Sequence, residues 1–326
     1  MRFYAILFIF LLLSPPSYCN TIDIPSLEKK ATEGNLEAQF NLGEIYYSGE
    51  ILPQDCEKSI YWYKKAADKG WTNAQLSLGI IYTKGCGPFQ DYKQAANWYS
   101  KAAEKNNAKA QFNLALLYSK GLGVTQDHKM ALHWYQKSAS QGFSDAQYNL
   151  ALMYANGKGM PIDFKKAAYW YKKAAEQDDP LAQYNLGLLY SSGQGIYKDN
   201  NEAIVWFRKA ATLGLACAQY EIGNRYALGE GIQQDYQQAA FWYIQAAKQG
   251  FSGAQYLLGV LYYKGQAVSQ DYTKAYAWIT LAALQGHNNA ITAQKELEDI
   301  MDIESLNTAK QLTVEYQKTY AEHPQP

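Results

Sequence analysis

Residues 182–195 have the sequence AQYNLGLLYSSGQG, and the same pattern returns at a fixed spacing through most of the chain. Ala-Gln pairs begin at residues 38, 74, 110, 146, 182, 218 and 254, each 36 residues after the one before, and Ala290 falls on the next step. A period of about 20–50 residues is typical of proteins in which each structural unit packs on its neighbours. The sequence therefore predicts a repeat array without insertions.

Several other positions keep the same step. The tyrosine, glycine, aspartate and tryptophan of this repeat, Tyr190, Gly193, Asp199 and Trp206, each have a counterpart in all seven repeats. Seven of the eight tryptophans thus hold one structural position. Such agreement indicates one folding unit used seven times, in which stacked units share a hydrophobic core that none can form alone.

Each unit is predicted to contain two helices. Ala182, Leu186 and Tyr190 are four residues apart, which places them on one face of a helix. Gly193 ends that helix, where a left-handed residue is favoured. Asp199 then caps a second helix through its side-chain oxygen. The repeat is therefore expected to be a helical hairpin.

The starts of the first helices carry candidate caps. Asp179 precedes Pro180, a residue favoured at the first helical position. In other repeats the predicted caps are Thr72, Ser144 and Ser252. Glycine closes most second helices, and Asn106 and Asp178 replace it in two repeats, because both residue types tolerate the left-handed conformation.

The repeated unit resembles the Sel-one-like repeat family, a branch of the tetratricopeptide superfamily. The resemblance is carried by residues 182–195, Asp199, Ala203, Trp206-Phe207 and Lys209-Ala210-Ala211. It implies an all-α, right-handed solenoid of stacked helical hairpins that acts as an adaptor or scaffold in protein complexes. Many bacterial members of this family are exported and act in the envelope or in contact with a host.

These patterns divide the chain into four parts. We expect a signal peptide over residues 1–19 and an N-terminal capping half-repeat over residues 20–37. Seven Sel-one-like repeats follow over residues 38–289. C-terminal capping helices and a tail occupy residues 290–326, where the 36-residue pattern decays and a polar outer face is expected.

The N-terminal segment has the features of a secretion signal. Met1-Arg2 precedes the apolar run Phe3–Leu13, and cleavage is expected near Cys19. The apolar run is shorter than the roughly 20 residues that span a bilayer. A lipidated Cys19 is the alternative, disfavoured because Tyr18 before it is bulky. We therefore expect a protein of the periplasm or a secreted protein, without a membrane span.

Composition argues against a nucleic-acid partner. Thirty Lys and Arg residues balance thirty Asp and Glu residues, and no basic run of five occurs. A nucleic-acid or anionic-membrane partner would require a concentrated positive charge. The expected partner is a protein or a peptide.

The mature chain would keep three cysteines, and an odd number leaves at least one unpaired. Cys56 and Cys86 lie in neighbouring repeats, so stacking could bring them together as a disulfide, or both could remain thiols. Cys217, at a helix start, is expected to be a buried thiol.

One polar position on the first helices is a candidate for partner binding. It holds Asn41, Asn113, Asn149 and Asn185, while Ser77, Glu221 and Leu257 replace asparagine in other repeats. In the superfamily that this chain resembles, first helices line a concave groove, so these asparagines and Arg225 are candidates to hold an extended segment. The alternative is that asparagine is a consensus residue that bonds within the array.

We expect no catalysis, no cofactor and no metal site. Ser26 and Lys29 match the Ser-x-x-Lys of penicillin-recognising enzymes, but neither Lys-Thr-Gly nor Ser-Asp-Asn follows. His128 and His133 are five residues apart, which does not place them on one helical face. A β-lactamase-like or cell-wall enzyme remains one rival interpretation, and a secreted virulence factor that contacts host proteins is the other.

Overall fold

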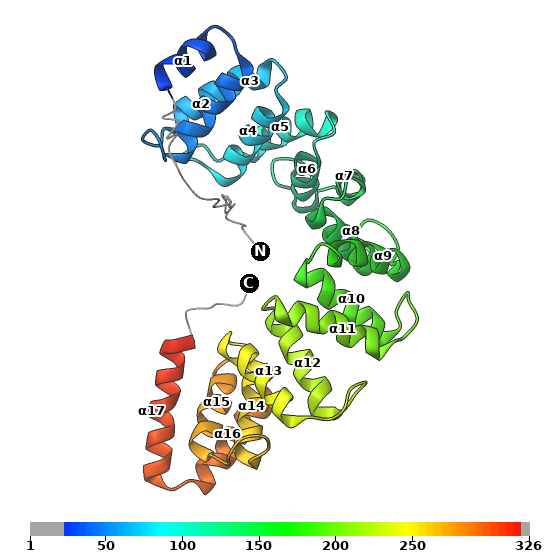
Figure 1. Ribbon diagram of the computed structural model, residues 1–326, viewed down its shortest axis with the longest axis vertical. Coiled ribbons are helices and arrows are strands. Elements are labelled where there is room, and N and C mark those ends of the chain that lie inside the picture. Colours follow the sequence, from blue (N-terminus) through cyan, green and yellow to red (C-terminus); the bar gives the residue numbers. More distant parts are fainter. Residues whose placement is uncertain (1–22, 321–326) are drawn as a thin grey trace, which may run out of the picture. The chain divides into compact units, whose positions relative to one another are not determined.

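The computed structural model describes residues 23–320, and every regular element in that range is a helix (Figure 1). The helices are α1 (Ile24–Thr32), α2 (Leu36–Ser48), α3 (Cys56–Asp68), α4 (Thr72–Lys84), α5 (Tyr92–Glu104), α6 (Ala108–Lys120), α7 (His128–Ser140), α8 (Ser144–Asn156), α9 (Phe164–Ala175), α10 (Pro180–Ser192), α11 (Asn200–Thr212), α12 (Ala216–Leu228), α13 (Tyr236–Lys248), α14 (Ser252–Lys264), α15 (Tyr272–Leu284), α16 (Asn288–Ile300) and α17 (Ile303–Tyr320). The all-α prediction is confirmed. The expected signal peptide lies outside the described residues.

The described chain divides into two compact units, residues 23–162 and residues 163–320, called here the N-terminal and C-terminal units. Within each unit, first helices with even numbers alternate with second helices with odd numbers. In the C-terminal unit α10 packs against α11, α11 against α12, and α12 against α13, so each hairpin stacks on the next.

The predicted signals at the second helices are confirmed. Asp199 accepts the backbone N–H groups of Asn201 at 2.9 Å and Glu202 at 3.2 Å, which satisfies two unpaired donors at the start of α11. The same aspartate caps all seven second helices. Asn106 and Asp178 adopt positive φ angles of 63° and 60°, as expected for residues that replace glycine.

The predicted caps at Thr72, Ser144 and Ser252 are wrong, whereas Asp179 does cap α10 through the N–H of Ala182. These three helices begin one residue earlier than the capping pattern requires, and the N-cap residues are Trp71, Phe143 and Phe251, without a side-chain cap bond. The Phe143 ring lies 5.3 Å from the Phe112 ring of the preceding first helix. Aromatic packing between repeats thus occupies the place where a polar cap was expected.

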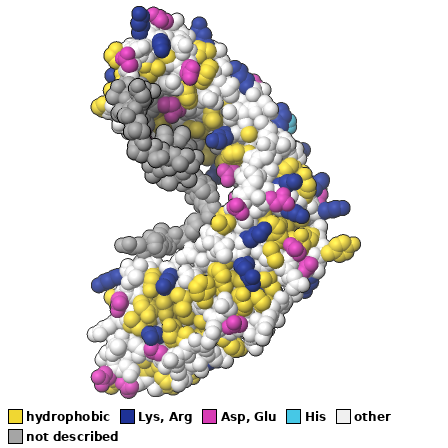
Figure 2. Space-filling model, in the orientation of Figure 1, with side chains coloured by type: hydrophobic (Ala, Val, Ile, Leu, Met, Phe, Trp, Pro, Cys, Tyr) yellow, Lys and Arg dark blue, Asp and Glu magenta, His cyan; other side chains and the backbone are white. Residues whose placement is uncertain are grey.

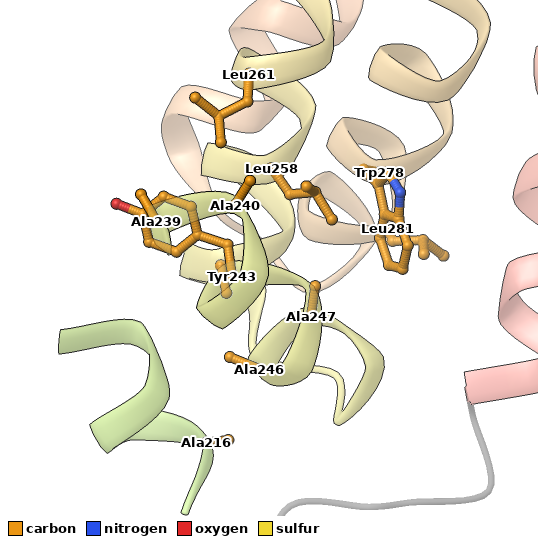
Figure 3. Packing of buried hydrophobic residues seen from close by; sticks show 11 residues of the cluster. Ala216, Ala239, Ala240, Tyr243, Ala246, Ala247, Leu258, Leu261, Trp278 and Leu281 are labelled. Carbon is orange, nitrogen blue, oxygen red and sulfur yellow. The ribbon is translucent and has the colours of Figure 1, made fainter. Parts of the chain in front are cut away.

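The deepest core layer is formed by the residue that follows each tryptophan. Phe207 is fully buried, and its ring covers Gly187 of α10 so closely that a Cβ there would approach the ring to 2.7 Å. Figure 3 shows the equivalent layer around Tyr243, together with Ala216 of α12 and Leu258 of α14. Glycine on the first helix therefore lets an aromatic ring of the second helix lie against its backbone.

The glutamine of each Ala-Gln pair joins one repeat to the next. Gln183 donates through Nε2 to the carbonyl oxygen of Ala175, at the end of the preceding second helix, over 3.1 Å. The corresponding donors, each bonded to the carbonyl eight residues earlier, are Gln39, Gln75, Gln111, Gln147, Gln219 and Gln255. All seven are buried. Their recurrence is explained by this bond, because a buried backbone carbonyl needs a donor.

The last helix departs from the repeat. α17 packs on α15, where the Trp278 ring lies 4.6 Å from the Tyr316 ring. Ala277 and Leu281 of α15 are buried, although the equivalent Val205 and Lys209 of α11 are exposed. α17 therefore covers the face that other second helices turn to solvent, and it closes the C-terminal unit (Figure 1).

Candidate protein-binding face

The four predicted asparagines lie on first helices of two different units. Asn41, Asn113 and Asn149 belong to α2, α6 and α8, and Asn185 belongs to α10. Asn41 is exposed, and the other three are half-buried. The side-chain nitrogens of Asn149 and Asn185 donate to the carbonyl oxygens of Asp145 and Leu181, four residues earlier in the same helix. Those two amides are thus oriented by their own helices, and their oxygens take no part in these bonds.

A half-buried aromatic row accompanies the asparagine position, and sequence reasoning missed it. The residue just before the asparagine position is Phe40, Phe112 or Tyr148 in the N-terminal unit, where Leu76 interrupts the row, and Tyr184, Tyr220 or Tyr256 in the C-terminal unit. Four of these rings contact the core ring of the second helix in their own repeat, as Tyr184 contacts Phe207 at 5.7 Å, and Tyr256 instead stacks on His287. The available signal was an aromatic residue at six of the seven positions spaced 36 residues apart. We call this row and the asparagine position together the first-helix face.

Arg225 holds a position that is aliphatic and buried in the other six repeats. The equivalent residues are Ile45, Ile81, Leu117, Met153, Leu189 and Leu261. Only 12 % of the Arg225 side chain is exposed, and its guanidinium donates to Glu230 and to the Ser191 hydroxyl, both at 2.8 Å. Because a buried cation is costly without partners, these two contacts compensate it.

Glu221 lies one turn before Arg225 on α12 and replaces the consensus asparagine. It is half-buried, and within residues 23–320 its carboxylate forms neither a hydrogen bond nor an ion pair. Burial raises the pKa of Glu221, and the nearby charge of Arg225 only partly offsets that effect. The carboxylate is therefore held in a site that disfavours its charge.

Cys56 and Cys86 form a disulfide, with Cα atoms 5.7 Å apart. Cys56 begins α3, and Cys86 lies in the turn after α4, so the bond joins neighbouring repeats. Cys217 is a free thiol on α12, and burial raises its pKa to about 11. A thiol with a raised pKa is a poor nucleophile at neutral pH.

The motifs considered for catalysis and metal binding lie on repeat helices or turns. Ser26 and Lys29 are on α1, and His128 and His133 are on α7. No group of three potential metal ligands is present in the part of the chain that the structure describes. Between residues 23 and 320, no helix has the length and apolar character needed to cross a bilayer. The face drawn in Figure 2 shows basic and acidic side chains scattered among hydrophobic ones.

Stacked helical hairpins of 36 residues place the protein in the class of helical-repeat scaffolds with a solenoid fold. The Sel1 repeat pattern matches seven segments of the chain, residues 36–71, 72–107, 108–143, 144–179, 180–215, 218–251 and 252–287. The chain therefore belongs to the Sel1 repeat family, whose members are in general protein-interaction modules.

Two solved structures support this assignment. The chain is 34 % identical to a Sel1 repeat protein from Oxalobacter formigenes, with a TM-score of 0.71 and coverage of 84 % of this chain and 79 % of that one. It is 31 % identical to a protective antigen of uropathogenic Escherichia coli that displays an SLR fold, with a TM-score of 0.60 and coverage of 92 % of this chain and 72 % of that one. A search of curated proteins found no match.

Proposed function

We propose that this protein is an exported scaffold that binds a segment of another protein along its first-helix face. The supporting observation is the aromatic row. Its rings are fixed on one side by core rings such as Phe207 and remain partly accessible on the other. Rigid aromatic side chains contribute large contact areas at low entropic cost, which is why they are enriched at protein interfaces.

The asparagines beside these rings suit an extended backbone. An asparagine amide can donate and accept hydrogen bonds, which matches the alternating groups of a peptide. Asn149 and Asn185 each use a donor within their own helix, so their amide oxygens are the groups proposed to accept from the partner. Aromatic contacts would supply affinity, and the amides would set the register of the bound segment.

Site-specific photocrosslinking tests the proposed face. Binders are selected from a random-peptide phage library with the protein lacking residues 1–19, and a photoreactive amino acid then replaces Asn41, Asn113 or Asn97. Asn97 is the matched control, since it is an exposed asparagine on the second helix α5. We expect crosslinks from a first-helix position. Crosslinks from Asn97 alone would place binding on the wrong face.

Export is part of the proposal, and the disulfide supports it. Disulfides persist in oxidising compartments such as the periplasm and are rare in the cytosol. Together with the signal-like residues 1–19, the Cys56–Cys86 bond favours the periplasm or secretion, with a lipidated Cys19 as the alternative. Cell fractionation with and without residues 1–19 tests this. A cytosolic location for the full chain, with both cysteines reduced, would contradict export.

A second candidate function is a secreted factor that contacts host proteins. The similarity to the protective antigen of uropathogenic Escherichia coli favours it, because an antigen that elicits protection is exposed to the host. Recovery of the protein from culture medium without cell lysis would support this candidate. Retention in the periplasm would leave the resident scaffold as the function.

We propose no catalytic role. The β-lactamase-like and cell-wall-enzyme interpretations depend on Ser26 and Lys29, which lie on the first capping helix rather than on the proposed binding face. Nitrocefin turnover by the purified protein, abolished in a Ser26→Ala variant, would reverse that conclusion.

A further inference from the structure

We propose that Glu221 binds a lysine or arginine side chain of the partner segment, so that the C-terminal unit selects a basic residue at this repeat. This inference rests on the proposed function and names a determinant of its specificity. It is carried by two departures from the repeat on one face of α12, by the lack of a direct ion pair or hydrogen bond at Glu221, and by the aromatic row on the same first-helix face.

The two departures occur within one helical turn. Glu221 stands where four repeats have asparagine, and Arg225 stands where six repeats have a buried aliphatic residue. In a repeat array, the other copies show what packing alone requires. The contacts with Glu230 and Ser191 account for Arg225, whereas no contact accounts for Glu221, which places a carboxylate at the asparagine position of this copy.

Arg225 neutralises Glu221 only in part. The guanidinium of Arg225 is held by Glu230 and Ser191 at 2.8 Å each, and no ion pair forms between Arg225 and Glu221. Glu230 is paired with Arg225, whereas Glu221 forms no direct ion pair within the described residues and feels the charge of Arg225 only from a distance. A half-buried carboxylate without a partner is unfavourable, and a cation that enters the site removes that penalty.

The surroundings of Glu221 suit an organic cation. Tyr184 of α10 and Tyr220 of α12 belong to the aromatic row of the first-helix face, on the two neighbouring first helices at this repeat. Tyr220, the neighbour of Glu221, has its ring 5.0 Å from the ring of Phe251. Tyrosine rings beside a carboxylate favour a lysine or arginine side chain, since its charge meets the carboxylate and its stem meets the rings.

A metal ion fits this site poorly. Within the described residues no three potential ligands come together, and the groups around Glu221 are tyrosines, an arginine and a thiol whose pKa is raised. A segment of protein that carries one basic side chain is therefore the occupant that the charge and the rings favour.

The test compares two variants with the wild-type protein. Glu221→Asn restores the residue found in four other repeats, so it keeps the fold while removing the charge. Glu176→Gln is the matched control, because Glu176 is an exposed acid at the end of the second helix α9. Peptides are selected from the phage library against each protein, and paired synthetic peptides with lysine or alanine at the enriched position are then titrated.

We expect wild-type and Glu176→Gln proteins to enrich one basic residue and to bind the lysine peptide roughly tenfold more tightly than the alanine peptide. Glu221→Asn should bind both peptides equally. Binders without a basic residue, or an unchanged lysine preference in Glu221→Asn, would overturn this inference and leave the scaffold function standing. A library that yields no binder for the wild-type protein would overturn both.

Discussion

The side chain of Gln183 lacks a hydrogen bond that the equivalent glutamine forms in other repeats. The amide oxygens of Gln111, Gln219 and Gln255 each accept from a glutamine 30 residues later, at 2.7–2.8 Å. Leu213 occupies that place for Gln183, whose buried amide oxygen has no partner within the described chain. The same bond is missing at Gln39 and Gln75, where the residue 30 positions later is a lysine, so three copies of the repeat lack it within the described chain.

Replacing Leu213 with glutamine should supply this bond. Leu213 is half exposed and has nearly the same backbone angles as Gln249, so little packing is lost. We expect Leu213→Gln to raise the free energy of unfolding by about 1 kcal/mol, measured by urea denaturation. Leu228→Gln, an exposed leucine at a helix end, controls for the lost apolar surface and should be neutral. Equal effects of the two variants would contradict the account.

Glu221 should reduce stability at neutral pH. Its pKa is raised in the folded state, so the folded protein binds the proton more tightly than the unfolded chain does. The contribution of Glu221 to the free energy of unfolding therefore falls as the pH rises from the ordinary pKa of a glutamate to the raised pKa of the folded state. Glu221→Gln should be more stable than wild type at pH 7, and the difference should disappear below about pH 4. Thermal melts across this range measure it, and a pH-independent difference would show that the carboxylate charge is not the cause.

At the level of single helices, local chemistry predicts some boundaries and misses others. Asp199 and its counterparts could be predicted because a side-chain cap depends on residues only two or three positions away. Ser144 is not the cap of α8 because Phe143, whose ring packs on Phe112 of the preceding repeat, takes the N-cap position. That choice depends on a neighbouring repeat, which a local pattern does not contain.

The candidate binding face, too, could be predicted from the sequence only in part. The asparagine position could be predicted because it recurs with the period of the repeat. The bonds of Arg225 to Ser191 and Glu230 could not be predicted, because Ser191 is 34 residues away in the sequence. The docking of α17 on α15 was also missed. Its signal was present in Ala277 and Leu281, small and apolar residues where α11 carries Val205 and Lys209.

A single substitution can test how helix α17 is held on the C-terminal unit. Ala309 is fully buried in α17 and belongs to the cluster of Ala275 and Ile279 of α15, whereas its neighbour Lys310 is exposed. Ala309→Asp would bury an unpaired charge at a cost on the order of 3 kcal/mol, enough to release α17. We expect rapid proteolysis within residues 303–320 for Ala309→Asp and none for Lys310→Asp. Equal protection of both variants would show that α17 does not depend on this contact.

At the scale of the whole molecule, repeats stabilise one another mainly through the hairpins that they touch. Each buried glutamine reaches only the preceding helix, as Gln75 reaches Ala67, and each core ring covers the facing helix of its own repeat, as Tyr99 covers Gly79. In such an array, stability is approximately a sum of local and nearest-neighbour contributions. A perturbation at one joint should therefore weaken that joint and leave distant hairpins protected.

Removal of the Cys56–Cys86 disulfide is such a perturbation, because it acts on one joint between neighbouring repeats. The disulfide closes a segment of 30 residues between neighbouring repeats, and its removal should cost roughly 3–4 kcal/mol through the greater entropy of the unfolded chain. We expect Cys56→Ser/Cys86→Ser to accelerate hydrogen exchange in α3 and α4, while helices α10–α15 keep their protection. Cys217→Ser, which removes a thiol outside the bridge, is the control and should leave α3 and α4 unchanged. Uniform acceleration through α15 would instead mean that the array unfolds as one cooperative body, because only then would a bond near one end determine the protection of every hairpin.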